Sequence, residues 1–309
     1  MEFDFNKPDV PIRLLLWLVR KILDSYPGRA ILRRANEVSL RKFDHWVEVK
    51  EIELQLPRLD RPFDGYRLVL ISDFHLGTWL DRSHLQDAIN LVNRAHPDLV
   101  AITGDFVTYR PEEFAGDLVA VLRQIQAHDG VVAVLGNHDH WSDPRVVRRI
   151  LRHANIRELA NDVLSIKRQG AQLHIAGVDD IMEELDDLES VLQKLPANGC
   201  SILLAHEPDF ADQSAFSGRF DLQLSGHTHG GQIFLPILKM PILPRYGRKY
   251  PIGLYRVEEM YQYTNRGLGT ADLQLRFNCQ PEITVLTLKS IAITESTPTD
   301  VYQATLDSF

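Results

Sequence analysis

The chain has 309 residues, of which 44% are hydrophobic and 25% are charged. This is the composition of an ordinary folded protein, and it excludes extensive disorder or a fibrous structure. The formal net charge of −8 argues against a generally basic surface that would bind nucleic acid. Two cysteines, Cys200 and Cys279, are too few for a disulfide framework, so we expect a reducing, cytoplasmic location.

The N-terminal arm, residues 1–42, differs in charge from the rest of the chain. Its segment 11–42 has eight basic and two acidic residues. The uninterrupted apolar run within it, 14–19, is much shorter than the roughly 20 residues that cross a bilayer. As a helix it would have one apolar face, with Trp17 and cations suited to the inner surface of the cytoplasmic membrane. The alternative is a helix that packs on the body or on a second subunit.

From residue 66 onward, short apolar runs alternate with segments of helical periodicity. We expect a β-α-β-α-β series with a parallel core sheet at 67–72, 83–95, 99–103, 112–127 and 131–135. The following elements are a helix at 144–154, a hairpin at 163–177 that turns near Gly170, and a helix at 187–195. Further strands are expected at 201–205, 221–225, 254–258, 261–264 and 283–288. No linker divides residues 43–290, which we interpret as one domain with two sheets, followed by a C-terminal extension, 291–309.

Residues that bind metals in proteins stand just after five of these strands. They are Asp73, His75, Asp105, Asn137, His138, Asp139, His206, His227 and His229. Any one group alone is typical of a turn or a helix cap, but their recurrence at successive strand ends favours a site for two cations. A mixture of carboxylate and imidazole suits Mn, Fe, Zn or Co, whereas Ca or Mg would favour oxygen ligands alone.

In order along the chain, these groups resemble the signature of the calcineurin-like metallophosphoesterase superfamily. The matching motifs are Asp73-x-His75, Gly104-Asp105, Gly136-Asn-His-Asp139, His206 and Gly226-His-Thr-His229. Flanking stretches are similar to a bacterial branch of membrane-associated phosphodiesterases, which includes chlamydial-type UDP-2,3-diacylglucosamine hydrolases of lipid A biosynthesis. The resemblance covers about residues 46–288. It implies a four-layer α/β/β/α sandwich of two mixed sheets.

The resemblance also implies a role for each residue. Asp73, His75 and His229 would bind one ion, Asn137, His206 and His227 would bind the other, and Asp105 would bridge the two ions. His138 would face the substrate phosphate, with Asp139 as the acid that orients it. Two divalent ions, Mn²⁺ first and Zn²⁺, Fe²⁺ or Co²⁺ as alternatives, would share a hydroxide that attacks phosphorus.

The segment 233–250 is unusually apolar for a loop and also contains basic residues. It either contacts an acyl chain or a membrane surface, as segment 11–42 would, or folds back on the sheet as core. His140, Arg266 and Arg276 are candidates for binding the substrate.

Three functions stay open at this stage. The first is a phosphodiester or pyrophosphate hydrolase that acts on an amphiphilic or membrane-surface substrate such as UDP-2,3-diacylglucosamine. The second is a soluble phosphatase or phosphodiesterase for nucleotides or small phosphoesters. The third is a non-catalytic scaffold of the same fold, which the complete ligand set disfavours. The oligomeric state is not determined by the sequence.

Overall fold

A computed structural model describes residues 47–232, 243–271, 274, 276 and 278–291. The predicted arm, residues 233–242 of the apolar loop, and all of the predicted extension except Ile291 lie outside the described residues. The expectations for those segments therefore stay predictions.

The first sheet contains the predicted parallel core. Its strands are β1 (Glu48–Leu56), β2 (Tyr66–Ile71), β3 (Leu99–Thr103), β4 (Val131–Val134), β5 (Arg157–Glu158) and β12 (Glu282–Ser290). Their order is β1-β12-β2-β3-β4-β5. Strands β2 to β5 are parallel neighbours, while β12 runs antiparallel to β2 and makes the sheet mixed. Every side chain of β3 is buried, as expected for a strand covered on both faces.

The second sheet begins and ends with a hairpin. Its strands are β6 (Asp162–Arg168), β7 (Ala171–Gly177), β8 (Cys200–Leu204), β9 (Leu222–Ser225), β10 (Gly253–Val257) and β11 (Met260–Thr264). The order is β10-β11-β9-β8-β7-β6, parallel in the middle and antiparallel in the outer pairs. The predicted turn at Gly170 is present, with a φ of 86° that favours glycine.

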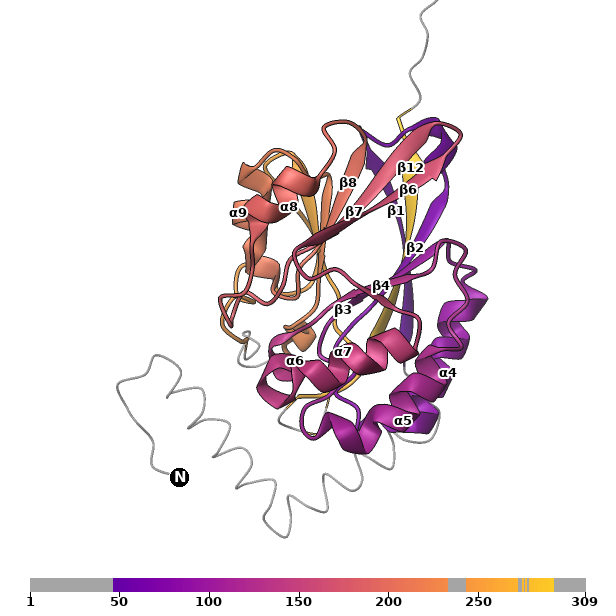
Figure 1. The fold of residues 1–309 in the computed structure, drawn as a ribbon, viewed down its shortest axis with the longest axis vertical. Helices are drawn as coiled ribbons and strands as arrows, with labels where there is room; N and C mark the ends of the chain where they lie inside the picture. The colour runs from indigo at the N-terminus through magenta and orange to yellow at the C-terminus, as the bar shows by residue number, and fades with distance from the viewer. Residues whose placement is uncertain (1–46, 233–242, 272–273, 275, 277, 292–309) are drawn as a thin grey trace, which may run out of the picture.

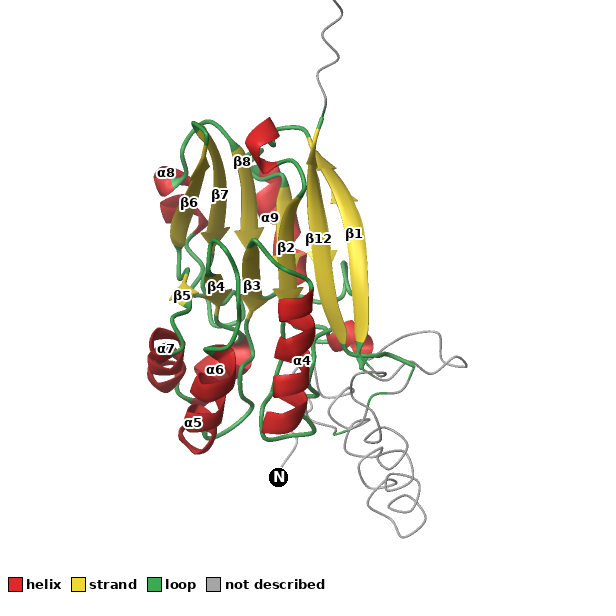
Figure 2. Ribbon diagram, turned by 90° about the vertical axis from the view of Figure 1, so that its right-hand side faces the viewer, coloured by secondary structure: helices red, strands yellow, loops and turns green. Residues whose placement is uncertain are grey.

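Helices cover the outer face of each sheet, which completes the predicted four layers (Figures 1 and 2). Those over the first sheet are α4 (Arg82–Arg94), α5 (Pro111–Leu122), α6 (Asn137–Ser142) and α7 (Pro144–His153). Those over the second are α8 (Leu188–Lys194) and α9 (Ala211–Phe216). Short 3-10 helices are η1 (Arg61–Phe63), η2 (Pro208–Phe210) and η3 (His229–Gly231). One hydrophobic core lies between the sheets, and one lies under each helical layer.

Two predicted helix boundaries were wrong for local reasons. Helix α4 starts before Ser83, because Asp81 is the cap and accepts a 2.9 Å hydrogen bond from the His84 amide. Helix α5 ends at Leu122 and does not continue to 127, because the Asn93 side chain bonds the backbone of Gln124 and Gln126. Neither difference moves a residue of the predicted site.

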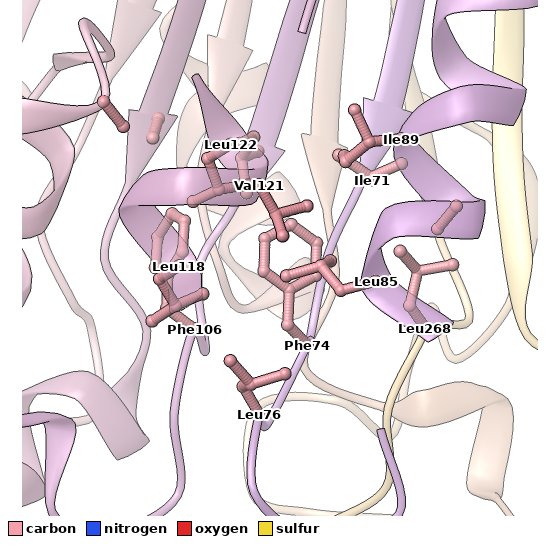
Figure 3. Close-up of a cluster of buried hydrophobic side chains, with 14 of the residues drawn as sticks. Ile71, Phe74, Leu76, Leu85, Ile89, Phe106, Leu118, Val121, Leu122 and Leu268 are labelled. Atoms are coloured by element: carbon pink, nitrogen blue, oxygen red, sulfur yellow. The ribbon is translucent and has the colours of Figure 1, made fainter. Parts of the chain in front are cut away.

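The core under α4 and α5 fixes the loops that follow β2 and β3. Phe74 and Phe106 pack edge to face in this core, with ring centroids 5.4 Å apart (Figure 3). Each phenylalanine directly follows a predicted metal ligand, Asp73 or Asp105. The two loops also run side by side, because the amide of Asp73 donates to Gly104 O at 3.0 Å. In the described ranges, no helix is long and apolar enough to span a bilayer.

Candidate metal centre

The carboxyl ends of strands from both sheets converge on one buried cluster of polar side chains. The contributing strands are β2, β3 and β4 of the first sheet and β8 and β9 of the second. All seven predicted ligands are at most 6% exposed, and they are Asp73, His75, Asp105, Asn137, His206, His227 and His229. Burying so many polar groups is costly unless each finds a partner or a cation.

The first group consists of Asp73, His75, Asp105 and His229. One ligand atom from each lies within 4.8 Å of the others. Nε2 of His75 is 3.1 Å from Nε2 of His229 and 3.3 Å from Oδ2 of Asp105. Two imidazole nitrogens and a carboxylate oxygen that converge in this way are the kinds of ligand atom that bind a divalent transition metal.

The second group, which contains His206, His227 and Asn137, approaches the same oxygen of Asp105. Oδ2 of Asp105 is also 3.3 Å from Nε2 of His206. The ring centroid of His206 is 4.9 Å from that of His227. Asn137 is 2% exposed, and its Oδ1 atom accepts no hydrogen bond from the described residues. A buried amide oxygen without a donor is a ready ligand for a cation.

Backbone carbonyls fix the tautomers of two histidines. Nδ1 of His206 donates to Thr103 O at 2.5 Å, so Nε2 is the nitrogen that faces Asp105 and can bind a cation. Nε2 of His227 donates to Arg245 O at 2.8 Å, so its Nδ1 carries the lone pair. Hydrogen bonds of this kind orient metal-binding imidazoles.

The pKa shifts in the cluster favour neutral His227 and His229 and an ionised Asp105. For His206, burial lowers the pKa, but Asp105 and Glu207 outweigh it and raise that pKa well above its ordinary value, so a cation would displace a proton there. Burial, together with His206, lowers the pKa of His227 to about 3. Burial, together with His75 and Arg276, also holds the pKa of His229 well below its ordinary value. Burial alone would raise the pKa of Asp105, but His206, His138 and His75 outweigh it and hold that pKa well below the usual range. Neutral imidazoles and carboxylates are the forms that bind metal ions.

Several of these residues have an unfavourable backbone conformation. Positive φ values between 46° and 70° occur at Asp73, His75, Asp105, His227 and His229. Each costs a non-glycine residue roughly 1 kcal/mol or more, and such strain is concentrated at functional sites.

Comparison with known proteins assigns the family. A family model described as calcineurin-like phosphoesterase matches residues 66–231. The chain is 38% identical over 253 residues to the uncharacterized metallophosphoesterase YkuE of Bacillus subtilis, covering 80% of this chain and 87% of that protein. The chain belongs to the calcineurin-like phosphoesterase family. It is a metal-dependent phosphoester hydrolase, and the superfamily and fold predicted from the motifs are confirmed.

Two further relatives of this phosphoesterase carry more specific names. Phosphodiesterase YaeI of Escherichia coli is 30% identical over 226 residues, covering 72% of this chain and 82% of that protein. A transmembrane protein with metallophosphoesterase domain from Danio rerio is 34% identical over 257 residues. That match covers 78% of this chain but 57% of the zebrafish protein.

His138 lies at the edge of the phosphoesterase's buried cluster. It is half-buried, whereas the seven ligand candidates are buried. Its backbone amide donates to Oδ1 of Asp105 at 2.9 Å, and its ring centroid is 4.7 Å from that of His75. The position lies beside the ligand candidates, and the role of a residue that faces the substrate phosphate stays a prediction.

Asp139 bonds the backbone around the metal centre. Its carboxylate accepts hydrogen bonds from the backbone amides of Asp105, Gly136 and Phe106 at 2.9, 3.1 and 2.9 Å. The side chain therefore joins the loop after β3 to the start of α6. The predicted role of Asp139 in orienting the His138 ring stays a prediction.

The three candidates for substrate binding have other partners in this phosphoesterase. Arg266 forms ion pairs with Glu282 and Glu48. Arg276 is buried and donates to the carbonyls of Gly269 and Arg266 at 2.8 and 2.7 Å. His140 Nε2 is 2.8 Å from Oδ1 of Asp179. These three residues support neighbouring segments, and we leave them out of the proposed substrate site.

Sequence reasoning also missed contributions from the backbone. The carbonyls of Thr103 and Arg245 orient two histidines, yet every residue has a carbonyl, so no sequence signal could identify them.

Proposed function

We propose that this phosphoesterase hydrolyses phosphodiester or pyrophosphate bonds with two divalent cations at the cluster. One cation would be held by Asp73, His75 and His229 and the other by Asn137, His206 and His227, with Asp105 shared. The observation that carries the proposal is the buried Asn137 Oδ1 atom, which has no donor among the described residues and lies on the same helix, α6, as His138. An additional cation site at that position explains why an uncharged oxygen is buried there.

The cations, when bound, supply Lewis acidity and lower the pKa of a coordinated water. The protein's own residues then do three things. Asp105 presents its Oδ2 atom to both ligand groups, and its backbone amide is held by Asp139. His206 and His227 present fixed lone pairs. His138, half-buried beside the donors, gives a proton to the leaving oxygen.

Mn²⁺ is the ion that we propose first, with Zn²⁺, Fe²⁺ and Co²⁺ as alternatives. The combination of two acids, one amide and four histidines suits borderline transition metals better than Ca²⁺ or Mg²⁺, which favour oxygen ligands.

For the substrate, we propose an amphiphilic phosphodiester or pyrophosphate at the inner membrane surface, with UDP-2,3-diacylglucosamine as the compound to test. Ile252 and Leu254, which follow the apolar segment 233–250, are 42% and 43% exposed. In support, the name of the Danio rerio relative places a metallophosphoesterase domain in a transmembrane protein, and that of the Escherichia coli relative is a phosphodiesterase.

The reaction class is tested with bis-p-nitrophenyl phosphate and p-nitrophenyl phosphate after dialysis against chelator and reloading with each metal. The proposal expects metal-dependent turnover that is faster with the diester. Faster turnover of the monoester would favour the small-phosphoester alternative. No turnover with any metal would contradict hydrolysis.

The membrane proposal has a separate test. Full-length protein should float with vesicles that contain anionic lipid, and protein lacking residues 1–42 should float less. Equal failure of both proteins to float would remove the membrane from the proposal and leave the chemistry untouched.

A further inference from the structure

Trp141 is an exposed aromatic residue beside the metal centre that none of the roles above uses. It is 54% exposed and lies on α6, three residues after His138. The ring centroids of Trp141 and His138 are 4.8 Å apart, and those of His138 and His75 are 4.7 Å apart. Residues at i and i+3 share a face of a helix. The rings of His75, His138 and Trp141 therefore form a row from the buried metal-ligand candidates to the surface.

The indole is fixed in orientation although it is exposed. Its Nε1 donates to Oε1 of Glu183 at 2.7 Å. The same helix is joined to the segment after β7 through the 2.8 Å contact of His140 with Asp179, which Arg148 also bonds at 3.1 Å. A rigid aromatic surface loses little conformational entropy when a ligand covers it.

The chemistry around Trp141 selects among ligands. Its single hydrogen-bond donor is already used by Glu183, so the exposed surface of the indole offers contact with its ring. Glu183 and its neighbour Glu184 are both exposed carboxylates, and their charge disfavours an anionic group at this position. The surface thus suits a flat, uncharged ring.

We propose that Trp141 is a stacking subsite for an uncharged aromatic ring in the group that is esterified to the substrate phosphate, such as the base of a nucleoside or an aryl ring. This inference rests on the proposed function, because it requires the phosphate to lie at the metal centre beside His138. Stacking on Trp141 would then hold the remainder of the ester next to the group that protonates it. Residues Asn137 to Trp141 of one helix would contribute a metal ligand, the proton donor and a specificity residue.

The test measures binding of phosphonates to the full-length, Mn²⁺-loaded protein by calorimetry, without turnover. Methylphosphonate, phenylphosphonate and n-hexylphosphonate share the group that binds metal and differ in the attached group. The variants are Trp141→Ala, Trp141→Phe, Glu183→Ala and Glu183→Gln. Phe216→Ala is the matched control, because Phe216 is 92% exposed but lies on α9 over the second sheet.

The subsite predicts that Trp141→Ala raises the Kd of phenylphosphonate about tenfold, the effect of losing one stacked ring. Methylphosphonate binding should be unchanged, and Trp141→Phe should retain most of the affinity for the phenyl compound. Glu183→Ala should weaken phenylphosphonate binding more than Glu183→Gln does, because glutamine keeps a side-chain acceptor for the indole. Phe216→Ala should bind all three compounds as the wild type does.

Three results would overturn the inference in distinguishable ways. Unchanged binding of phenylphosphonate by Trp141→Ala would remove the subsite and leave the proposed function standing. An equal loss for n-hexylphosphonate would mean that Trp141 recognises an apolar chain, as a lipid substrate would offer, and not a flat ring. Failure of methylphosphonate to bind the wild type would contradict phosphate binding at the metal centre, and with it the subsite.

Discussion

The carboxylate of Asp139 accepts a 2.9 Å hydrogen bond from the backbone amide of Asp105. Through this bond, and through those to Gly136 and Phe106, a buried acid on α6 fixes the loop that carries the proposed shared ligand. The same acid was expected to orient the His138 ring, and the two roles have different consequences when it is removed.

Asp139→Ala should weaken Mn²⁺ binding by roughly 10–100-fold, the usual cost of losing a group that supports metal ligands. Calorimetric titration of metal-free protein with Mn²⁺ measures this directly. If the variant kept the wild-type affinity and lost only kcat, Asp139 would act through His138 and not through the loop.

His138→Ala should keep both metal ions and lower kcat by about 10²–10⁴-fold, the range for loss of a general acid. The reason is that His138 lies beside the donors without being buried among them. Metal content by mass spectrometry and kcat on an aryl diester are measured on the same sample. Loss of bound metal would contradict the role of proton donor.

Asp105→Ala should impair binding at both cation positions. Its Oδ2 atom is 3.3 Å from the Nε2 atoms of both His75 and His206, one from each ligand group. Metal content after gel filtration should fall well below that of the wild type at both positions. Retention of one fully occupied ion would show that Asp105 belongs to a single group.

Gly136→Ala should reduce metal binding and activity, because an added Cβ would lie 2.4 Å from Oδ1 of Asp105 and 2.7 Å from Cε1 of His206. Both contacts are shorter than packed atoms allow, so a ligand must move. Gly116→Ala on α5 is the control, since nothing lies within 4 Å of its Cβ. That exposed helical substitution should stabilise the fold by about 0.5–1 kcal/mol. Wild-type activity of Gly136→Ala would show that the loops adapt freely.

Arg168→Met tests how the two sheets are held together at a distance from the proposed chemistry. Arg168 on β6 of the second sheet bonds Asp98 at 2.9 Å and Asp129 at 2.8 Å, and both acids precede strands of the first sheet. The substitution takes the guanidinium away from two partly buried carboxylates, which keep their hydrogen bonds from Arg67, Tyr66 and His128, and it should cost about 1–3 kcal/mol in urea unfolding at pH 7. Arg157→Met removes the more exposed pair with Asp162 and should cost less.

The effect of Arg168 should depend on pH in a defined direction. Burial tends to raise the pKa of Asp129, but hydrogen bonds from His128 and Tyr66 and the charge of Arg168 lower it overall. A carboxyl with a lowered pKa stabilises the fold above its ordinary value of about 3.9, and this contribution is lost as pH falls through the folded pKa. The stability difference between wild type and Arg168→Met should therefore shrink below about pH 4. A difference that grows on acidification would contradict this assignment.

The sequence predicted the fold well where its patterns were continuous. Strand β3 is apolar along its length, and α7 has regular apolar spacing after the Asp143 cap, so both were expected close to their observed bounds. Strand β1 was not predicted, although Leu54 and Leu56 alternate with exposed residues. Half of its side chains face solvent, which weakens the apolar signal, and its pairing with β12 comes from the far end of the chain.

The predicted ligands are close together because strand ends converge at one edge, which a sequence can indicate. The contacts of Arg266 and Arg276 could not be predicted in this way. Their partners Glu48, Glu282 and Gly269 are selected by tertiary packing, and an arginine near a motif looks the same whether it faces substrate or a buried carboxylate.

Anomalous diffraction from crystals loaded with Mn²⁺ would show whether two cations share Asp105. Two cations that share Asp105 predict two anomalous peaks about 3.5–4 Å apart, with the Asp105 carboxylate between them and Asn137 Oδ1 contacting one of them. A single peak among Asp73, His75 and His229, with Asn137 contacting no ion, would contradict it.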